Sequence, residues 1–381
     1  MTAWLRAFFS YRALTVCLLG SLLLLAACAQ EPWTPGKPLS KDKVRIGVLY
    51  IDKAENCGYS FAHEQGLRAM QETIGLRDDQ ILRKFDVSGS DSMMVEHVIR
   101  NCISAGANVI IATSFGYMDV CDKLAREFPG VVFAHASGYK WNNTNFTNYF
   151  GRIYQARYLG GIVAGLKTRS NKIGFVAAMG LDNSEVTGGV NAFALGVESV
   201  NPGARIFVRV TNNWYDPASE RQAARNLLLQ GCDVIAQHCD TANPQLEAER
   251  AGVWSVGYNS DMSAQAPNAV LTSVIWNWQI YYTRLVESVL SGNFRTAPYY
   301  GGMAEGLVDI SPLSALCPPE TEAAVNAARE ALRQGAFSVF VGPMRANNGN
   351  IHGATGERLS DEEIIGGMNW YYHTVSDIST E

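Results

Sequence analysis

The sequence lacks the motifs on which most catalytic sites depend. It contains no G-x-S-x-G, no H-E-x-x-H and no P-loop, so it gives no sign of the sites that these motifs build. His238, Cys239 and Asp240 are consecutive in an expected strand, where side chains alternate between the two faces and cannot act as one triad. GGIVAG at 160–165 follows a helical stretch. A dinucleotide-binding glycine turn follows a strand, so this stretch is not predicted to bind a dinucleotide. We expect no enzyme and no cofactor.

The sequence also lacks His and Cys residues at the spacing of metal ligands, and it has few clusters of basic residues. No C-x-x-C occurs and no His or Cys pair has ligand spacing, so no metal site is predicted. The formal charge is −5, which with few basic clusters argues against a nucleic-acid partner. In an exported protein some cysteines could pair, and free buried thiols are the equal alternative. The six in question are Cys57, Cys102, Cys121, Cys232, Cys239 and Cys317.

One apolar run stands at the N-terminus. Arg6 and Arg12 precede it, and it ends in LAAC at 25–28, which predicts an export signal over 1–27 that is short for a membrane-spanning helix. LAAC resembles the bacterial lipobox, which implies cleavage before Cys28 and acylation of its thiol; an ordinary signal with a chance cysteine is the alternative. Cleavage would bring the charge to −7, since two arginines leave. The proline-containing stretch 28–43 reads as a tether.

The rest of the chain alternates between apolar runs and amphipathic stretches. VRIGVLYI, NVIIATSFG and VVFAHASG form one series, and NKIGFVAAMG, ARIFVRVTNNW, CDVIAQHCD and VWSVGYNSDM form a second. Continuous apolar runs between helices indicate parallel strands covered on both faces. The sequence therefore predicts an α/β protein with two doubly wound domains. Its last part reads as a strand from about residue 337, a turn-rich loop and a helix capped by Ser360.

Polar and aromatic residues follow the strands of both series. In open parallel sheets a ligand lies beyond the carboxyl ends of the strands, so these positions predict a polar cleft with stacking faces. Each has a structural alternative when taken alone; Asp216 before Pro217, for example, reads as a helix cap. The candidates are Asp52, Asn56, Tyr59, Ser114, Phe115, Ser137, Trp214, Asp216, Asp240, Asn259 and Asp261.

A family resemblance rests on motifs that occur in order between about residues 44 and 375. They are GYSFAHEQG, ATSFGYMD, ARYLGGIVAG, GVNAFALGVESVNPGA, WYDPASERQAA, LLQGCDVIAQHCD, VGYNSDMS and LSDEEIIGGMNWYYHTV. Together they resemble the basic membrane protein family of lipoprotein substrate-binding components of ABC importers. The resemblance implies a type I periplasmic-binding fold with two Rossmann-like lobes and a three-crossing hinge. It implies an N-terminal lobe of 44–150 plus about 270–305 and a C-terminal lobe of 151–269 plus about 306–381.

The resemblance also assigns roles. The family's D-x-x-F-N loop falls on Asn56, Tyr59 and Ser60, so Tyr59 inherits stacking on the ligand base, and Trp214 is the candidate second wall. Gly58 would allow a tight turn before a helix beginning near Phe61. The family's D-x-D loop falls on Asn259 and Asp261, and Asp261 is the expected polar anchor.

Two positions depart from nucleoside-binding relatives. Trp276 stands where they carry Lys, and Ser137 where they carry Asp. A ribose hydroxyl left unpaired costs about 1–3 kcal/mol, so a free base such as adenine becomes as good a ligand as a nucleoside. We expect a monomeric, lipid-anchored, extracytoplasmic protein that hands a purine to an ABC permease. The alternatives are a ligand-sensing regulatory lipoprotein of the same fold and a nucleoside hydrolase.

Overall fold

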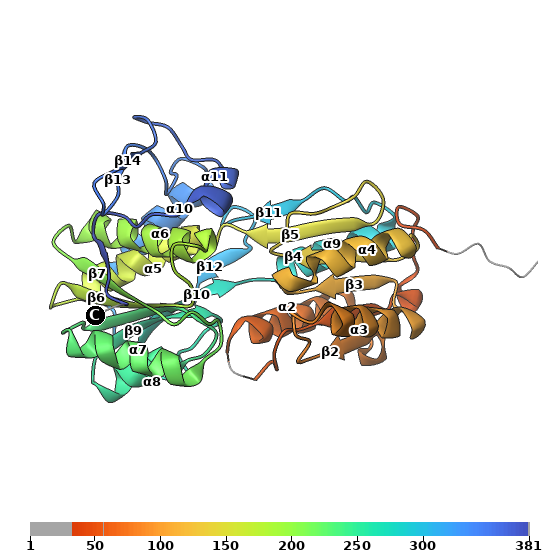
Figure 1. Cartoon of the computed structure of the whole chain (residues 1–381), viewed down its shortest axis with the longest axis horizontal. Helices are drawn as coiled ribbons and strands as arrows, with labels where there is room; N and C mark the ends of the chain where they lie inside the picture. Colours follow the sequence, from red (N-terminus) through yellow and green to blue (C-terminus); the bar gives the residue numbers. More distant parts are fainter. Residues whose placement is uncertain (1–32, 56, 380–381) are drawn as a thin grey trace, which may run out of the picture.

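The computed structural model describes residues 33–55 and 57–379, so the signal peptide, Cys28 and Asn56 lie outside the described residues. These form two α/β lobes side by side along the long axis, with strands β10, β11 and β12 where the lobes meet (Figure 1). No helix in the described ranges has the length and apolar character needed to cross a membrane.

The N-terminal lobe is built on a six-stranded sheet in the order β11-β5-β4-β3-β1-β2, with every pairing parallel. Strands β1, β3 and β4 are wholly buried, as their apolar runs predict. The strands are β1 Ile46–Leu49, β2 Ile81–Lys84, β3 Val109–Ala112, β4 Val132–Ala136, β5 Phe146–Gly151 and β11 Tyr299–Gly301. The helices are α2 Tyr59–Ile74, α3 Ser92–Ser104, α4 Met118–Glu127 and α9 Gln279–Ser291.

The C-terminal lobe repeats the plan in a seven-stranded sheet ordered β12-β10-β9-β8-β6-β7-β15. All pairings are parallel except that of β10 with β12. The strands are β6 Lys172–Ala177, β7 Arg205–Val210, β8 Val234–His238, β9 Trp254–Asn259, β10 Val270–Trp276, β12 Val308–Ile310 and β15 Val375–Asp377. The helices are α5 Ile153–Lys167, α6 Ser184–Val200, α7 Pro217–Leu229, α8 Asn243–Arg250, α10 Thr321–Arg333 and α11 Asp361–Gly367.

The chain passes between the two sheets three times, from β5 to α5, from β10 to α9 and from β11 to β12. The second crossing occurs later in the chain than the lobe boundary expected near residue 270. Strand β10 pairs with β9 in the C-terminal sheet, so the chain leaves that lobe after Trp276. We call these three crossings the hinge.

The C-terminal segment agrees with its prediction only in part. Ser360 caps α11, and its side chain accepts a hydrogen bond from the backbone N–H of Glu363. The strand expected from about residue 337 is replaced by a single bridge between Val341 and Arg358. Strands β13 Met344–Arg345 and β14 Ile351–His352 form a separate hairpin, and β15 then joins the edge of the C-terminal sheet.

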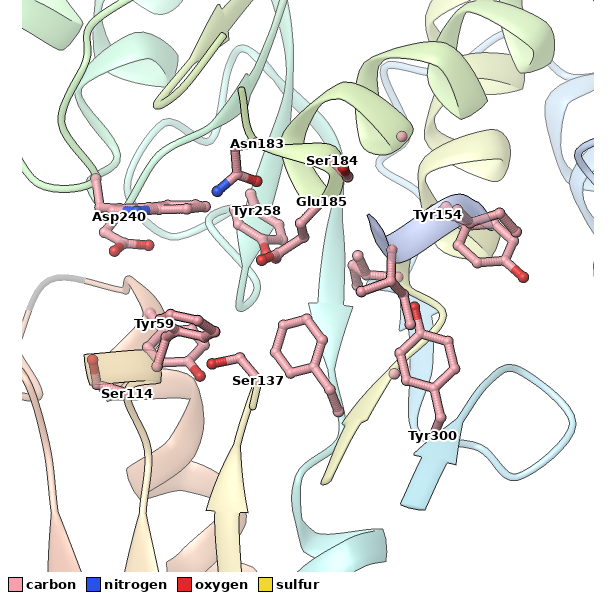
Figure 2. A pocket seen from close by; sticks show the side chains of 18 of the residues that line it. Tyr59, Ser114, Ser137, Tyr154, Asn183, Ser184, Glu185, Asp240, Tyr258 and Tyr300 are labelled. Atoms are coloured by element: carbon pink, nitrogen blue, oxygen red, sulfur yellow. The ribbon is translucent and has the colours of Figure 1, made fainter. Parts of the chain in front are cut away.

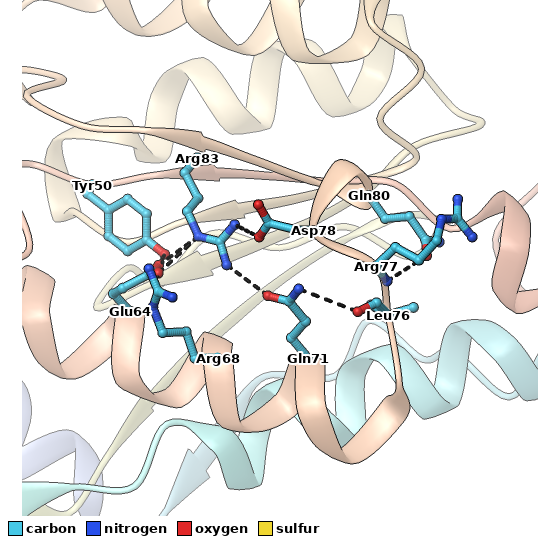
Figure 3. A network of polar contacts seen from close by, with 9 residues as sticks. All are labelled: Tyr50, Glu64, Arg68, Gln71, Leu76, Arg77, Asp78, Gln80 and Arg83. Carbon is cyan, nitrogen blue, oxygen red and sulfur yellow. Dashed lines mark hydrogen bonds and ion pairs between the residues drawn. The ribbon is translucent and has the colours of Figure 1, made fainter.

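Helix α2 is fixed to the edge of its sheet by a charged network (Figure 3). The carboxylate of Glu64 accepts hydrogen bonds from the hydroxyl of Tyr50 at 2.6 Å and from Nε of Arg83 at 2.9 Å. Arg83 also donates to Oε1 of Gln71, which lies about two helical turns after Glu64 in α2. Because Tyr59 is the first residue of α2, this network fixes the position of its backbone.

Candidate functional site

A cavity of about 490 Å³ lies between the lobes, in the range of pockets that enclose small-molecule ligands. Loops at the carboxyl ends of strands from both sheets line it, as the position of ligands in open parallel sheets predicts. In Figure 2, Tyr59, Ser114 and Ser137 approach from the N-terminal lobe, and Asp240, Tyr258 and Glu185 face them from the C-terminal lobe.

Most of the residues predicted at strand ends meet in this cavity. Those that line it are Asp52, Tyr59, Ser114, Phe115, Ser137, Trp214 and Asp240. They come from six separate segments of the chain and from both lobes. The strand ends selected from the sequence therefore converge on one cavity.

Five further candidates lie outside the lining. The hydroxyl of Ser60 accepts a hydrogen bond from the backbone N–H of Asp52, so it shapes the loop. Trp276 is buried and stacks on Trp278, with ring centroids 4.5 Å apart. Asn259 is buried behind Asp240.

The expected anchor Asp261 is solvent-exposed, and its carboxylate accepts a hydrogen bond from the backbone N–H of Ser263 in its own loop. It therefore lies outside the cavity that it was expected to line. Asp216 caps α7 by accepting from the backbone N–H groups of Ala218 and Ser219, which confirms its structural reading.

Tyr59 is held by contacts on its hydroxyl and on its ring. The hydroxyl donates to the carbonyl oxygen of Thr113 at 2.7 Å, and the ring meets the edge of His63 with centroids 4.4 Å apart. His63 itself stacks on Trp278 and shares a 2.5 Å hydrogen bond with the hydroxyl of Tyr282. Burial holds the pKa of His63 well below its usual value, so the ring is neutral and positions Tyr59.

On the facing lobe, Trp214 and Asp240 are joined through the backbone. The N–H of Asp240 donates to the carbonyl oxygen of Trp214 at 2.9 Å, and the side chain of Asp240 accepts from Nδ2 of Asn259 at 2.8 Å. The indole of Trp214 meets His238 edge-on at 5.7 Å. Burial raises the pKa of Asp240 well above its usual value, so a ligand that donates a hydrogen bond would stabilise its carboxylate.

Sequence reasoning missed Glu185, which lines the middle of the cavity. It lies in the first turn of α6, two residues after the cap Asn183, and Oε1 is 3.5 Å from Nε2 of His238. The sequence contained the feature that could have identified Glu185, because this residue lies after strand β6, just as the other candidates lie after their strands. Tyr154, Tyr258 and Tyr300 were missed as well, since they occur within helices and strands rather than after them.

The lining contains several acidic side chains. Four carboxylates border the cavity, and within the described residues no lysine or arginine does so. Arg157 lies behind the wall, fully buried, with its guanidinium 3.9 Å from the centre of the Tyr258 ring. Such a site disfavours anions such as nucleotides, and a ligand with N–H donors would stabilise the carboxylate forms of Glu185 and Asp240, whose pKa values are raised by burial. The lining carboxylates are Asp52, Asp182, Glu185 and Asp240.

The carboxyl of Glu185 should make stability depend on pH. Burial raises its pKa from the usual 4.5 to about 7, so the folded protein binds this proton more tightly than the unfolded chain does. The stabilisation by the proton is complete below the unfolded pKa and is lost as pH rises through about 7. Glu185→Gln should therefore gain unfolding free energy relative to the parent as pH rises, by at most about 1.4 kcal/mol per unit.

Chemical unfolding of the ligand-free protein across that pH range measures the difference. Glu322→Gln, on the exposed face of α10, is the control and should show no such trend. A difference between Glu185→Gln and the parent that stays constant with pH would refute the predicted burial of the carboxyl.

The arrangement can stack a planar ligand and accept its hydrogen bonds. Among the described residues no group of three or more His, Cys, Asp and Glu side chains could hold a metal ion. The six cysteines that sequence left open are free thiols in the structure, and five of them are buried.

Two lobes of this topology, three crossings and a ligand-sized cavity between the lobes define a type I periplasmic-binding protein. A solved solute-binding protein of an ABC transporter system from Conexibacter woesei DSM 14684 superposes with a TM-score of 0.65 at 19% identity, covering 77% of this chain and 97% of that one. The similarity confirms the predicted fold.

The chain belongs to the family described as Bmp, ABC transporter substrate-binding protein PnrA-like, whose model matches residues 43–331. It is 32% identical to the purine-binding protein BAB2_0673 of Brucella abortus (strain 2308), over 90% of this chain and 95% of that protein. It is 36% identical to the putative ABC transporter glucose-binding protein TsgA13 of Haloferax volcanii, over 81% of this chain and 76% of that protein. The protein is thus an extracytoplasmic substrate-binding component of an ABC transporter, as the resemblance implied.

Proposed function

We propose that the protein captures a purine base between its lobes and delivers it to an ABC permease. The observation that carries this proposal is that Tyr59 and Trp214, from opposite lobes, line the same cavity together with four carboxyl groups. A purine presents two π-faces to such walls and ring N–H or amino groups to the acceptors. The purine-binding relative supports the same ligand class.

Direct contacts between the lobes support capture by closure. The hydroxyl of Ser260 in the C-terminal lobe donates to the carbonyl oxygen of Cys57 in the N-terminal lobe at 2.7 Å. The side chain of Cys57 is buried in the hydrophobic cluster of the C-terminal lobe. A ligand that contacts both lobes stabilises this closed arrangement, and the permease would recognise it. We further propose that Cys28 carries the lipid that anchors the protein outside the cytoplasm.

Calorimetric titration of the purified protein tests the ligand class. Adenine is expected to bind with a micromolar or smaller dissociation constant, because two stacking faces contribute roughly 1–3 kcal/mol each. Adenosine, guanine and glucose are titrated in parallel, and glucose is included because of the Haloferax relative. Binding of glucose without binding of any purine would overturn the proposal.

The polar anchor is tested by a matched pair of aspartates. Asp240→Ala should weaken adenine binding about tenfold, because it removes a buried acceptor at the stacking end and leaves Nδ2 of Asn259 with only its 3.5 Å contact to the carbonyl oxygen of Cys239. Asp261→Ala should leave the affinity unchanged, since its side chain is exposed and outside the lining. Titration of both variants checks the ranking; a larger loss from Asp261→Ala would return the anchor to the loop that the family motif suggested.

A further inference from the structure

The cavity is longer than the stacking site. Besides the end formed by Tyr59, Trp214 and Asp240, it extends toward the hinge, where Tyr154 and Tyr300 lie beside α11 in Figure 2. We call this part the hinge-end compartment and define it by six residues. They are Phe150, Ile153, Tyr154, Tyr300, Ile364 and Ile365.

Three elements build this compartment around the hinge. Phe150 and Tyr300 are register partners on the adjacent strands β5 and β11, so their side chains lie on the same face of the sheet. Ile153 and Tyr154 open α5 directly after the first crossing. All four belong to segments that link the lobes, so a group bound here contacts the hinge itself.

Helix α11 forms the outer wall through Ile364 and Ile365. Ile364 is buried, whereas Ile365 is 48% exposed although it borders the cavity. The family model ends at residue 331, so this wall comes from a part of the chain beyond the matched region.

An ion pair holds that wall in place. The guanidinium of Arg152 contacts both carboxylate oxygens of Asp361, at 3.0 and 2.5 Å, and donates to the carbonyl oxygen of Tyr300 at 2.7 Å. It also lies 5.1 Å from the centre of the Tyr300 ring. Arg152 thus ties the start of α11 to β11 and is itself occupied, so it offers a ligand no free charge.

The compartment presents rings and hydrocarbon, while the polar Asp182, Asn183 and Ser184 line the cavity from the start of α6. Its six side chains are three aromatic rings and three isoleucines, and their only polar atoms are the two tyrosine hydroxyls. A ribose placed here would leave most of its hydroxyls unpaired, each at a cost that lowers affinity roughly five- to 150-fold. Each methylene group buried instead raises affinity about fourfold.

We propose that the hinge-end compartment accepts an apolar substituent, and that the ligand is a purine base carrying such a group. This inference rests on the proposed purine site and adds the chemical class of the substituent. The base stacks between Tyr59 and Trp214, and its substituent extends past Glu185 to the hinge and α11. Phe150, Tyr300 and Ile365 then determine which purines are preferred.

Titrations with adenine, N6-benzyladenine, 9-benzyladenine and adenosine test the proposal on the purified protein. At least one benzyladenine should bind tenfold or more tightly than adenine, and adenosine should bind less tightly than that compound. Adenine binding without any gain from either benzyl group, or adenosine binding tightest, would overturn this inference alone. No binding by any of the four would overturn the proposed function and the inference with it.

A variant pair locates the effect. Ile365→Ser should lower the ratio of benzyladenine to adenine affinity at least threefold, because it removes apolar wall at a half-exposed position that the fold tolerates. Ile351→Ser, at an exposed isoleucine of the separate β13–β14 hairpin, is the matched control and should leave the ratio unchanged. An unchanged ratio in Ile365→Ser would mean that the substituent does not reach α11.

Discussion

Removing both aromatic walls, as Tyr59→Ala with Trp214→Ala, is expected to weaken purine binding about thirtyfold or more. Each base–aromatic stack contributes roughly 1–3 kcal/mol by alanine substitution, and the two residues approach the ligand from different lobes. Each single variant should lose about fivefold at least. The Tyr59 variant also removes the hydrogen bond to Thr113, so circular dichroism and thermal unfolding are needed to establish that the lobe is intact.

A matched double variant controls for the loss of aromatic surface. Tyr139 and Trp141 are exposed aromatics of the same N-terminal lobe and lie outside the cavity lining. Tyr139→Ala with Trp141→Ala should bind purine like the parent. If the cavity variant kept the affinity of the parent protein, the stacking site would be misplaced, whatever the ligand proves to be.

Gly58→Ala is expected to weaken ligand binding at least tenfold while the lobes remain folded. A β-carbon at this position would lie 2.1 Å from the backbone carbonyl oxygen of Asp240 in the other lobe. Backbone atoms cannot yield as a flexible side chain does, so the closed arrangement must open to admit the methyl group. The tight-turn role expected for Gly58 is not the reason for glycine here, because its φ of −86° is open to any residue.

The control for this change is Gly367→Ala at the end of α11. No atom lies within 4 Å of the β-carbon that it would gain, so neither binding nor stability should change beyond the helix preference of alanine. Titration and small-angle scattering with and without adenine measure affinity and closure. Parent-like affinity and closure in Gly58→Ala would show that this contact does not belong to the ligand-bound form.

The sequence predicted the buried strands well, because strands covered on both faces are continuous apolar runs. Strand β2 was not predicted from its pattern, since it lies at the sheet edge and carries two charged residues, Lys84 and Arg83, the second of which pairs with Glu64. The lobe boundary near residue 270 was predicted too early in the chain. The apolar run Val270–Trp276 fits a buried strand of either lobe. Only its pairing with β9 decides the lobe.

The candidate site was predictable where it depends on strand ends and not where it depends on side-chain direction. Tyr59, Trp214 and Asp240 follow from the topology of parallel sheets. The direction in which a loop aspartate points does not follow from the topology. Asp261 accepts a hydrogen bond within its own loop, whereas Asp240 faces the cavity. Tyr154 and Tyr300 enter the lining only because the hinge brings α5 and β11 beside α11, a contact between distant segments.

The most direct test is native mass spectrometry of the protein purified without added ligand, followed by identification of the small molecule it releases. The account predicts a purine base, with a mass above that of adenine by an apolar substituent if the hinge-end compartment is filled. Adenine itself would support the proposed function without the further inference. A released sugar, peptide or metal ion would contradict the purine assignment.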